Sequence, residues 1–203
     1  MSDTGVMRTR RAGSARRAQV LEQVVEVLSE RGYAATRFTD VAKASGVAVS
    51  TLQSYFGSRE DMLVEALQNA TSGEVTALVE LAAEFEDPWQ QLVALVDRGL
   101  STPVPTWRML MEFWTAAAHD AELRAHAAVL AEQYRQPFME TVQRGVQAGS
   151  FSLRFEATAV VDVAVAAMDG LLYPLVLGHR SSADPDYRSV VLAQLAFVLG
   201  ADS

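Results

Sequence analysis

Residues 32–63 read GYAATRFTDVAKASGVAVSTLQSYFGSREDML, and this stretch decides the fold. Two short helical segments flank a turn at Gly46-Val47-Ala48. A helix needs about 12–15 residues to persist alone in water, so helices this short form only when they pack on a larger surface. The residues spaced to bury against that surface are Val41, Ala42, Val47, Leu52 and Phe56. The stretch therefore predicts a helix-turn-helix unit held by longer neighbouring helices.

Those neighbouring helices are marked on both sides of the stretch. Apolar residues at spacings of three and four predict a helix over residues 14–31; they are Leu21, Val24, Val25 and Leu28. Gly32 ends this helix, because glycine takes a positive φ without penalty. Thr39 is the predicted N-cap of the second helix. Ser58-Arg59-Glu60-Asp61 has the spacing of a capping box and predicts the start of a fourth helix.

The predicted third helix keeps an outer face that its packing residues do not use. This face is made of small and hydrogen-bonding side chains, namely Val49, Ser50, Gln53 and Ser54. An exposed helix of this kind fits the major groove of DNA, which is about 12 Å wide. The segment therefore predicts a DNA-reading element.

The rest of the chain predicts an all-α protein of nine helices, because strand-like alternation is absent and apolar residues recur at three and four. Later helices are predicted to start at Asp87-Pro88, Thr106, Asp120, residue 156 and Asp184-Pro185. We expect a flexible basic arm over residues 1–13, a helix-turn-helix domain over 14–60, and a helical effector-binding and dimerisation domain over 61–203.

Charge and composition narrow the class of protein. Residues 1–60 carry nine Lys and Arg against six Asp and Glu, a net charge of +3, whereas residues 61–203 carry eight against nineteen, or −11. A basic amino-terminal segment followed by an acidic remainder is expected when only that segment binds the phosphates of DNA. Cysteine is absent, and no nucleophile–base set, metal-ligand spacing or phosphate loop is visible. We expect neither an enzyme nor a metal or other cofactor.

Two segments bear on location. The amino-terminal residues lack the apolar run of a signal peptide, so we expect a cytoplasmic protein. Residues 157–177 are apolar enough to raise the question of a membrane span, but Asp162 and Asp169 oppose insertion. We interpret this segment as a core or interface helix.

The helix-turn-helix stretch resembles the TetR family of regulators. The matching positions are Gly32, Thr39, Val41-Ala42, Ser45-Gly46-Val47, Thr51-Leu52, Tyr55-Phe56 and Arg59-Glu60-Asp61-Met62-Leu63. Two positions depart from the family pattern: Gln53 stands where the family has Tyr, and Ala48 stands where the family has a capping Ser. We expect Ser50 to cap the third helix one step later.

The resemblance implies a role for each matched position. Thr39, Tyr55 and Arg59 would bind phosphates of the DNA backbone. Candidates for reading base edges are Val49, Ser50, Thr51, Gln53 and Ser54. Gln53 either replaces a phosphate-binding phenol or reads adenine through its amide. The side chains of Arg8, Arg10 and Arg11 either enter a minor groove or stay solvated.

Large and soft side chains gather later in the chain and suit a pocket for an apolar or aromatic effector. They are Trp89, Trp107, Met111, Phe113, Trp114, Tyr134, Phe138, Met168 and Tyr173; plain core packing is the alternative for each. Helices 156–177 and 185–199 carry apolar stripes for a homodimer. We therefore expect a repressor that a small effector releases from a palindromic DNA operator. The alternative is a dimeric DNA-binding regulator with a filled core and no effector.

Overall fold

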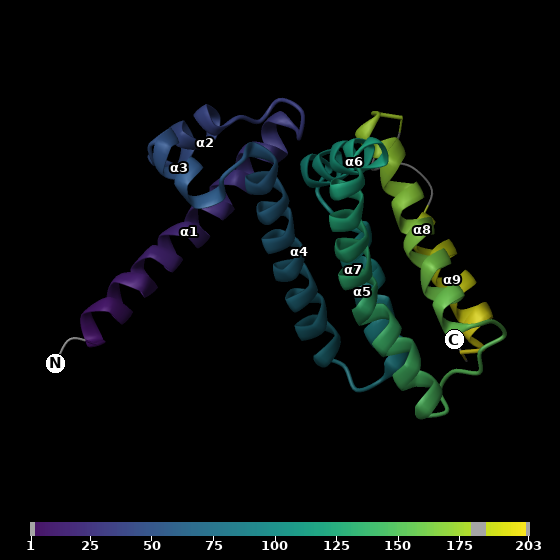
Figure 1. Ribbon diagram of the computed structural model, residues 1–203. Coiled ribbons are helices and arrows are strands. Elements are labelled where there is room, and N and C mark those ends of the chain that lie inside the picture. The colour runs from purple at the N-terminus through teal and green to yellow at the C-terminus, as the bar shows by residue number, and fades with distance from the viewer. Residues whose placement is uncertain (1–2, 180–185, 202–203) are drawn as a thin grey trace. The chain divides into compact units, whose positions relative to one another are not determined.

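The computed structural model describes residues 3–179 and 186–201, with the side chains of residues 3–14 left out. Within these limits the chain forms nine helices and no strand (Figure 1). They are α1 (Asp3–Arg31), α2 (Phe38–Ser45), α3 (Val49–Phe56), α4 (Arg59–Ala83), α5 (Pro88–Leu100), α6 (Val104–His119), α7 (Ala121–Gln147), α8 (Ala157–Val176) and α9 (Tyr187–Leu199). The predicted all-α fold is confirmed.

The helices belong to two compact units. The first contains the chain up to Ala70 together with Met109–His126, and the second contains Thr71–Arg108 and the chain from Ala127 onward. The boundaries fall inside α4, α6 and α7, so each of these helices contributes residues to both units. This division follows packing, and the functional domains 14–60 and 61–203 stay a prediction.

Three helix starts follow the capping chemistry that the sequence predicted. The Asp87 carboxylate accepts hydrogen bonds from the backbone N–H groups of Trp89 and Gln90 at the start of α5. Ser58 and Asp61 form the reciprocal capping box of α4, with the Asp61 N–H donating to the Ser58 hydroxyl at 3.0 Å. Asp120 accepts from the N–H group of Glu122 at 2.9 Å and caps α7. Each carboxylate or hydroxyl satisfies amides that the helix leaves free.

Three other predicted caps are wrong. Helix α2 begins at Phe38, because the Asp40 carboxylate accepts from the N–H group of Arg37 at 3.0 Å and makes Arg37 the N-cap in place of Thr39. Helix α3 begins at Val49, and its N-cap Ala48 provides no side-chain hydrogen bond, so Ser50 lies inside the helix. Helix α6 begins at Val104, before Thr106, since proline is tolerated in a first helical turn. The predicted start at Asp184-Pro185 lies outside the described residues.

Helix α1 begins earlier than predicted. Its backbone is helical from Asp3, where the sequence predicted an irregular arm over residues 1–13. Extending an existing helix adds one hydrogen bond for each residue fixed, so a helix nucleated by packing further along can continue outward. The side chains of Arg8, Arg10 and Arg11 lie outside the described ones, and the mobility of the arm stays a prediction.

Each unit has its own core. In the first, the packing residues predicted around the two short helices are buried, including Val41 and Leu52 at zero exposure, although Ala42 is only half-buried. In the second, one core joins side chains of α4, α5, α7, α8 and α9. The core of the first unit therefore gives the two short helices the stability that they lack alone in water.

Helix α8 has the length and hydropathy of a membrane span, the one such helix in residues 3–179 and 186–201. It packs on α5 and α9, and its Asp162 forms an ion pair with Arg135 of α7 at 2.7 Å. Only 28% of its apolar stretch is buried, so the described residues leave much of its surface uncovered. These features support its interpretation as a core and interface helix.

Candidate functional site

Helix α3 presents one exposed face of small polar side chains. Ser50, Gln53 and Ser54 are exposed at helical spacings of three and four. Leu52 and Phe56, on the opposite side, are buried in the core of the first unit. The half-buried residues that border the exposed face are Val49, Thr51 and Tyr55. All five base-edge candidates thus reach solvent, and their contact with bases stays a prediction.

The two candidate phosphate ligands beside this face are also accessible. Thr39 is exposed in the first turn of α2. Helix starts leave backbone N–H groups without intrahelical partners, which suits an anion. Tyr55 is half-buried, and its ring packs edge-on against Phe56 with the ring centroids 6.1 Å apart. Contact of either hydroxyl with phosphate stays a prediction.

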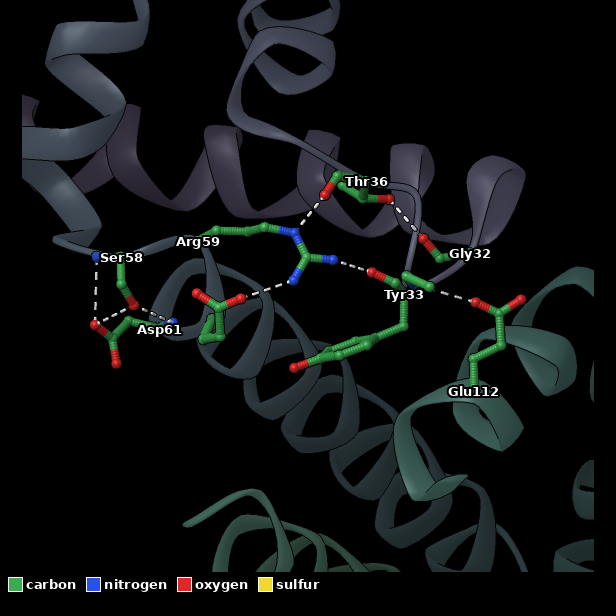
Figure 2. Close-up of polar contacts among 9 residues, drawn as sticks. Gly32, Tyr33, Thr36, Ser58, Arg59, Asp61 and Glu112 are labelled. Atoms are coloured by element: carbon green, nitrogen blue, oxygen red, sulfur yellow. Dashed lines mark hydrogen bonds and ion pairs between the residues drawn. The ribbon is translucent and has the colours of Figure 1, made fainter. Parts of the chain in front are cut away.

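The structure gives Arg59 contacts that the sequence did not predict. Its guanidinium donates hydrogen bonds to the carbonyl oxygens of Thr36, at 2.6 Å, and of Tyr33 (Figure 2). It also pairs with Glu60 at 2.9 Å and lies over the Tyr33 ring at 5.4 Å. Only two of its five N–H donors remain for a phosphate. Arg59 therefore holds the turn before α2, and its phosphate contact stays a prediction.

That turn, residues 32–37, is tightly specified. Gly32 has a φ of +84°, a conformation that side chains other than glycine rarely adopt. The hydroxyl of Thr36, a fully buried residue, donates to the Gly32 carbonyl at 2.8 Å. Burial raises the pKa of the Tyr33 phenol, and the nearby Arg59 charge offsets part of that rise. The turn therefore leads from α1 into α2 in a fixed direction.

Arg17 of α1 is a structural residue that the sequence analysis missed. Its guanidinium pairs with Glu65 of α4, with one hydrogen bond of 2.6 Å, and donates to the Tyr55 carbonyl at 3.2 Å. It also lies over the Phe56 ring at 4.9 Å. These contacts hold the end of α3 between α1 and α4. No local spacing signals them, since Arg17 and Glu65 are 48 positions apart.

The nine predicted effector residues are divided between the two units. Met111, Phe113 and Trp114 belong to the first unit. The other six belong to the second, and they are Trp89, Trp107, Tyr134, Phe138, Met168 and Tyr173.

Four of those six share one core. Phe138 and Met168 are fully buried there, and Trp89 and Tyr134 pack against the same core. Tyr173, by contrast, is 48% exposed. Membership of one core does not distinguish an effector site from plain core packing, so the effector role of all nine side chains stays a prediction.

A polar pair borders this core. Burial strongly raises the pKa of Tyr134, and the Asp169 charge raises it further. Burial also raises the pKa of the half-buried Asp169 carboxyl to about 6. A Cβ built on Gly99 would lie 3.0 Å from both the Tyr134 hydroxyl and the Met168 sulfur, so the packing here is close. The charges of Glu74 and Arg98 also act on the Tyr134 phenol, so acidic and basic groups both lie near this side of the core.

An apolar groove of about 300 Å³ lies along α8 and α9, which run side by side (Figure 1). Its lining includes Ala159, Val163, Ala167 and Val198 and contains none of the nine predicted effector residues. Val163 in its lining is 69% exposed, and Phe197 of α9, which is not part of the lining, is 65% exposed. This exposed apolar surface is a candidate interaction surface.

Both parts of the chain match known protein families. Residues 20–66 match the family model of bacterial regulatory proteins of the tetR family. Residues 88–200, more than half of the chain, match the model of the C-terminal part of BetI-type transcriptional repressors. The HTH-type transcriptional regulator BetI of Burkholderia ambifaria (strain MC40-6) is 28% identical over 116 residues, which are 54% of this chain and 58% of the relative. The match thus spans less than two thirds of that relative.

Solved structures share the fold over nearly the whole chain. A protein from Rhodococcus sp., described as a TetR-family transcriptional regulator, aligns with a TM-score of 0.79 and 20% identity, covering 92% of this chain and 99% of that one. A protein from Saccharomonospora viridis, described as a transcriptional regulator and solved with choline, aligns with a TM-score of 0.74 and 24% identity, covering 91% and 95%.

Replacing Arg59 tests its contacts with the turn. Arg59→Ala removes the donors to two carbonyl oxygens, so the free energy of unfolding should fall by about 2 kcal/mol, measured by urea titration. Arg16→Ala, on an exposed position of α1, is the control and should change stability little. If Arg59 acted only on phosphate, its variant would unfold like the control.

The raised pKa of Asp169 predicts a pH dependence of stability. The folded protein holds the Asp169 proton more tightly than the unfolded chain, so this contribution is complete below about pH 4 and is lost as the pH rises through about 6. Asp169→Asn should therefore gain stability relative to the natural chain between pH 4 and 7. The gain is at most about 3 kcal/mol, at about 1.4 kcal/mol per pKa unit, and less where water screens the charge. Parallel pH profiles of the two proteins in urea unfolding would contradict this.

Proposed function

Because the chain belongs to the TetR family of bacterial regulatory proteins, we propose that it is a dimeric repressor that a small apolar or aromatic effector releases from DNA. The observation that carries the proposal is the exposed face of α3, where Ser50, Gln53 and Ser54 stand opposite a buried side. A regulator of this kind acts on DNA in the cytoplasm.

DNA recognition divides between the exposed face and its neighbours. Ser50, Gln53 and Ser54, bordered by Val49 and Thr51, meet base edges in the major groove. Thr39 and Tyr55 bind phosphates and fix the register of α3, because backbone contacts position a protein and base contacts specify a sequence. Gln53 can donate and accept at once, the pattern that adenine presents.

One short helix makes few contacts, so specific binding requires two copies. In a dimer the two copies of α3 meet half-sites about one turn of DNA apart, and the operator is a palindrome. The apolar groove of α8 and α9 supports this assembly, because exposed Val163 and Phe197 are covered when the same surface of a second copy packs against it. Pro185, within the helix range first predicted for this contact, lies outside the described residues.

The proposed effector site lies in the core of the second unit. Trp89, Tyr134, Phe138 and Met168 offer aromatic and polarisable surface there. Asp169 at its border would favour an effector that also carries a positive group, as the choline bound to the Saccharomonospora viridis protein does. Bound effector favours one arrangement of the dimer, and a mismatch with the half-sites releases DNA.

A second candidate is a dimeric regulator without an effector. Complete burial of Phe138 and the close approach around Gly99 favour a filled core. The two candidates differ in one respect, since only the first loses operator affinity when a compound binds.

The DNA-binding proposal predicts two distinct mutant phenotypes. The chain should select a palindromic duplex from a randomised pool. Tyr55→Phe removes a phosphate contact, so it should weaken binding to every duplex by a similar factor, while the salt dependence of the binding constant should change little because a hydroxyl neutralises no phosphate charge. Gln53→Ala should instead change which duplex is preferred, by about 1–3 kcal/mol at the base it reads. Fluorescence anisotropy on selected and scrambled duplexes measures both.

The Gln53→Ala result also decides whether Gln53 contacts bases or the DNA backbone. A uniform loss of affinity in Gln53→Ala across all duplexes would make it a backbone ligand. Failure of the natural chain to enrich any duplex would contradict the proposed function itself.

The dimer proposal predicts the effect of a charge in the groove. Val163→Glu places an unpaired carboxylate in the contact, so the variant should be monomeric by light scattering at concentrations where the natural chain is dimeric. Its affinity for the selected duplex should fall with it. Val129→Glu, on an exposed position of α7, is the matched control and should remain a dimer. A dimeric Val163→Glu protein would exclude this surface.

A further inference from the structure

One face of helix α6 packs on the end of α1 and on the turn at residues 32–37. Its residues Met109, Glu112 and Phe113 follow the helical spacing of three and four. The Met109 sulfur lies 3.8 Å from the Ser29 hydroxyl, and the Phe113 ring lies 5.7 Å from the Tyr33 ring. All of these residues belong to the first unit.

Glu112 makes the polar contact of this face. The backbone N–H of Ala34 donates to its carboxylate at 3.5 Å (Figure 2). The same carboxylate occupies the space next to Gly32, where any side chain would overlap it. Gly32 therefore permits both the positive φ of the turn and the close approach of α6.

The turn lies between two opposite charges. Arg59 of α4 donates to its carbonyl oxygens at Tyr33 and Thr36, and Glu112 of α6 accepts from its N–H at Ala34. The bond from Arg59 to Thr36 is 2.6 Å, whereas the bond to Glu112 is 3.5 Å, near the limit for a hydrogen bond. The Glu112 contact is therefore the longer and weaker of the two.

The turn at residues 32–37 also fixes the start of α2. It ends at Arg37, the N-cap that Asp40 holds through its carboxylate. Asp40 also pairs with Arg31 at the end of α1, at 3.3 Å. A change in the direction of the turn is thus carried into α2, which contacts α3.

We propose that Glu112 is a positioning residue for DNA recognition, holding the turn so that α2 and α3 present the recognition face correctly. Loss of this contact would let the turn, and with it α2 and α3, move away from that arrangement. The inference rests on the proposed function. It adds a named residue, outside the two recognition helices, that sets how well α3 meets DNA.

The experiment compares Glu112→Ala, Glu112→Gln and the control Glu80→Gln, which removes an exposed carboxylate of α4. The DNA probes are the duplex that the natural chain selects and a scrambled duplex. Glu112→Ala should lose about two- to tenfold of the preference for the selected duplex, the range for one hydrogen bond. The slope of affinity against salt should not change, because Glu112 contacts no phosphate. Glu112→Gln keeps an acceptor of the same shape and should retain most of the preference.

Hydrogen exchange tests the same contact without relying on affinity. In Glu112→Ala the Ala34 amide should exchange about two- to tenfold faster, and the peptides of α3 should follow. Binding of the selected duplex should slow exchange in α6 of the natural chain and not in Glu112→Ala, because coupling between two sites is reciprocal.

Three results would overturn the proposal. Stronger binding of both Glu112 variants to every duplex, with a steeper salt slope, would mean that Glu112 only repels phosphate. Unchanged exchange at residues 32–37 in Glu112→Ala would mean that the contact holds nothing. If Glu112→Gln lost as much of the preference as Glu112→Ala, the hydrogen bond accepted from the Ala34 N–H would not be what positions the turn. If the natural chain selects no duplex, the proposed function fails, and the exchange measurement still decides the contact.

Discussion

Two helices of eight residues each cannot persist alone in water, and the proposed recognition surface of this protein is built from such a pair. The structure depends on how they are held. Leu52 and Phe56 bury one side of α3, while Arg17 fixes its end to α1 and α4. Arg59 fixes the turn that leads into α2. A surface that reads DNA needs its side chains held in position before DNA binds. Here the long helices α1 and α4 hold the short helices α2 and α3 in that position.

The second unit meets a different constraint. Helix α8 is strongly apolar, yet less than a third of its apolar stretch is buried by the part of the chain that the structure describes. One side packs on α5 and α9, and Asp162 forms an ion pair with Arg135. The side that remains, with Val163 at its centre, is what a second copy would cover. In the proposed dimer, the same composition that suggests a membrane span serves association.

Local chemistry in the sequence predicted much of the fold. The nine helices and the caps at Asp87, Ser58 and Asp120 all follow from residues within a few positions of one another. The contacts that the sequence could not predict join positions far apart in the chain. Glu65 lies 48 positions from Arg17, and Glu112 lies 78 from Ala34. The bonds from Arg59 to the turn were missed for a related reason, because a charged residue at a helix start looks like a surface residue until the carbonyl groups beside it are known.

The side-chain set that holds the recognition helices is scattered along the chain. Residues 14–60 contain Arg17, Gly32 and Arg59, but Glu65 and Glu112 come from further on. A chimaera that transplants residues 14–60 alone onto the body of a relative would leave Arg17 and the turn without their acidic partners. Exchange of DNA specificity between such proteins therefore requires a discontinuous graft that carries the partner positions of α4 and α6 along with the recognition helices.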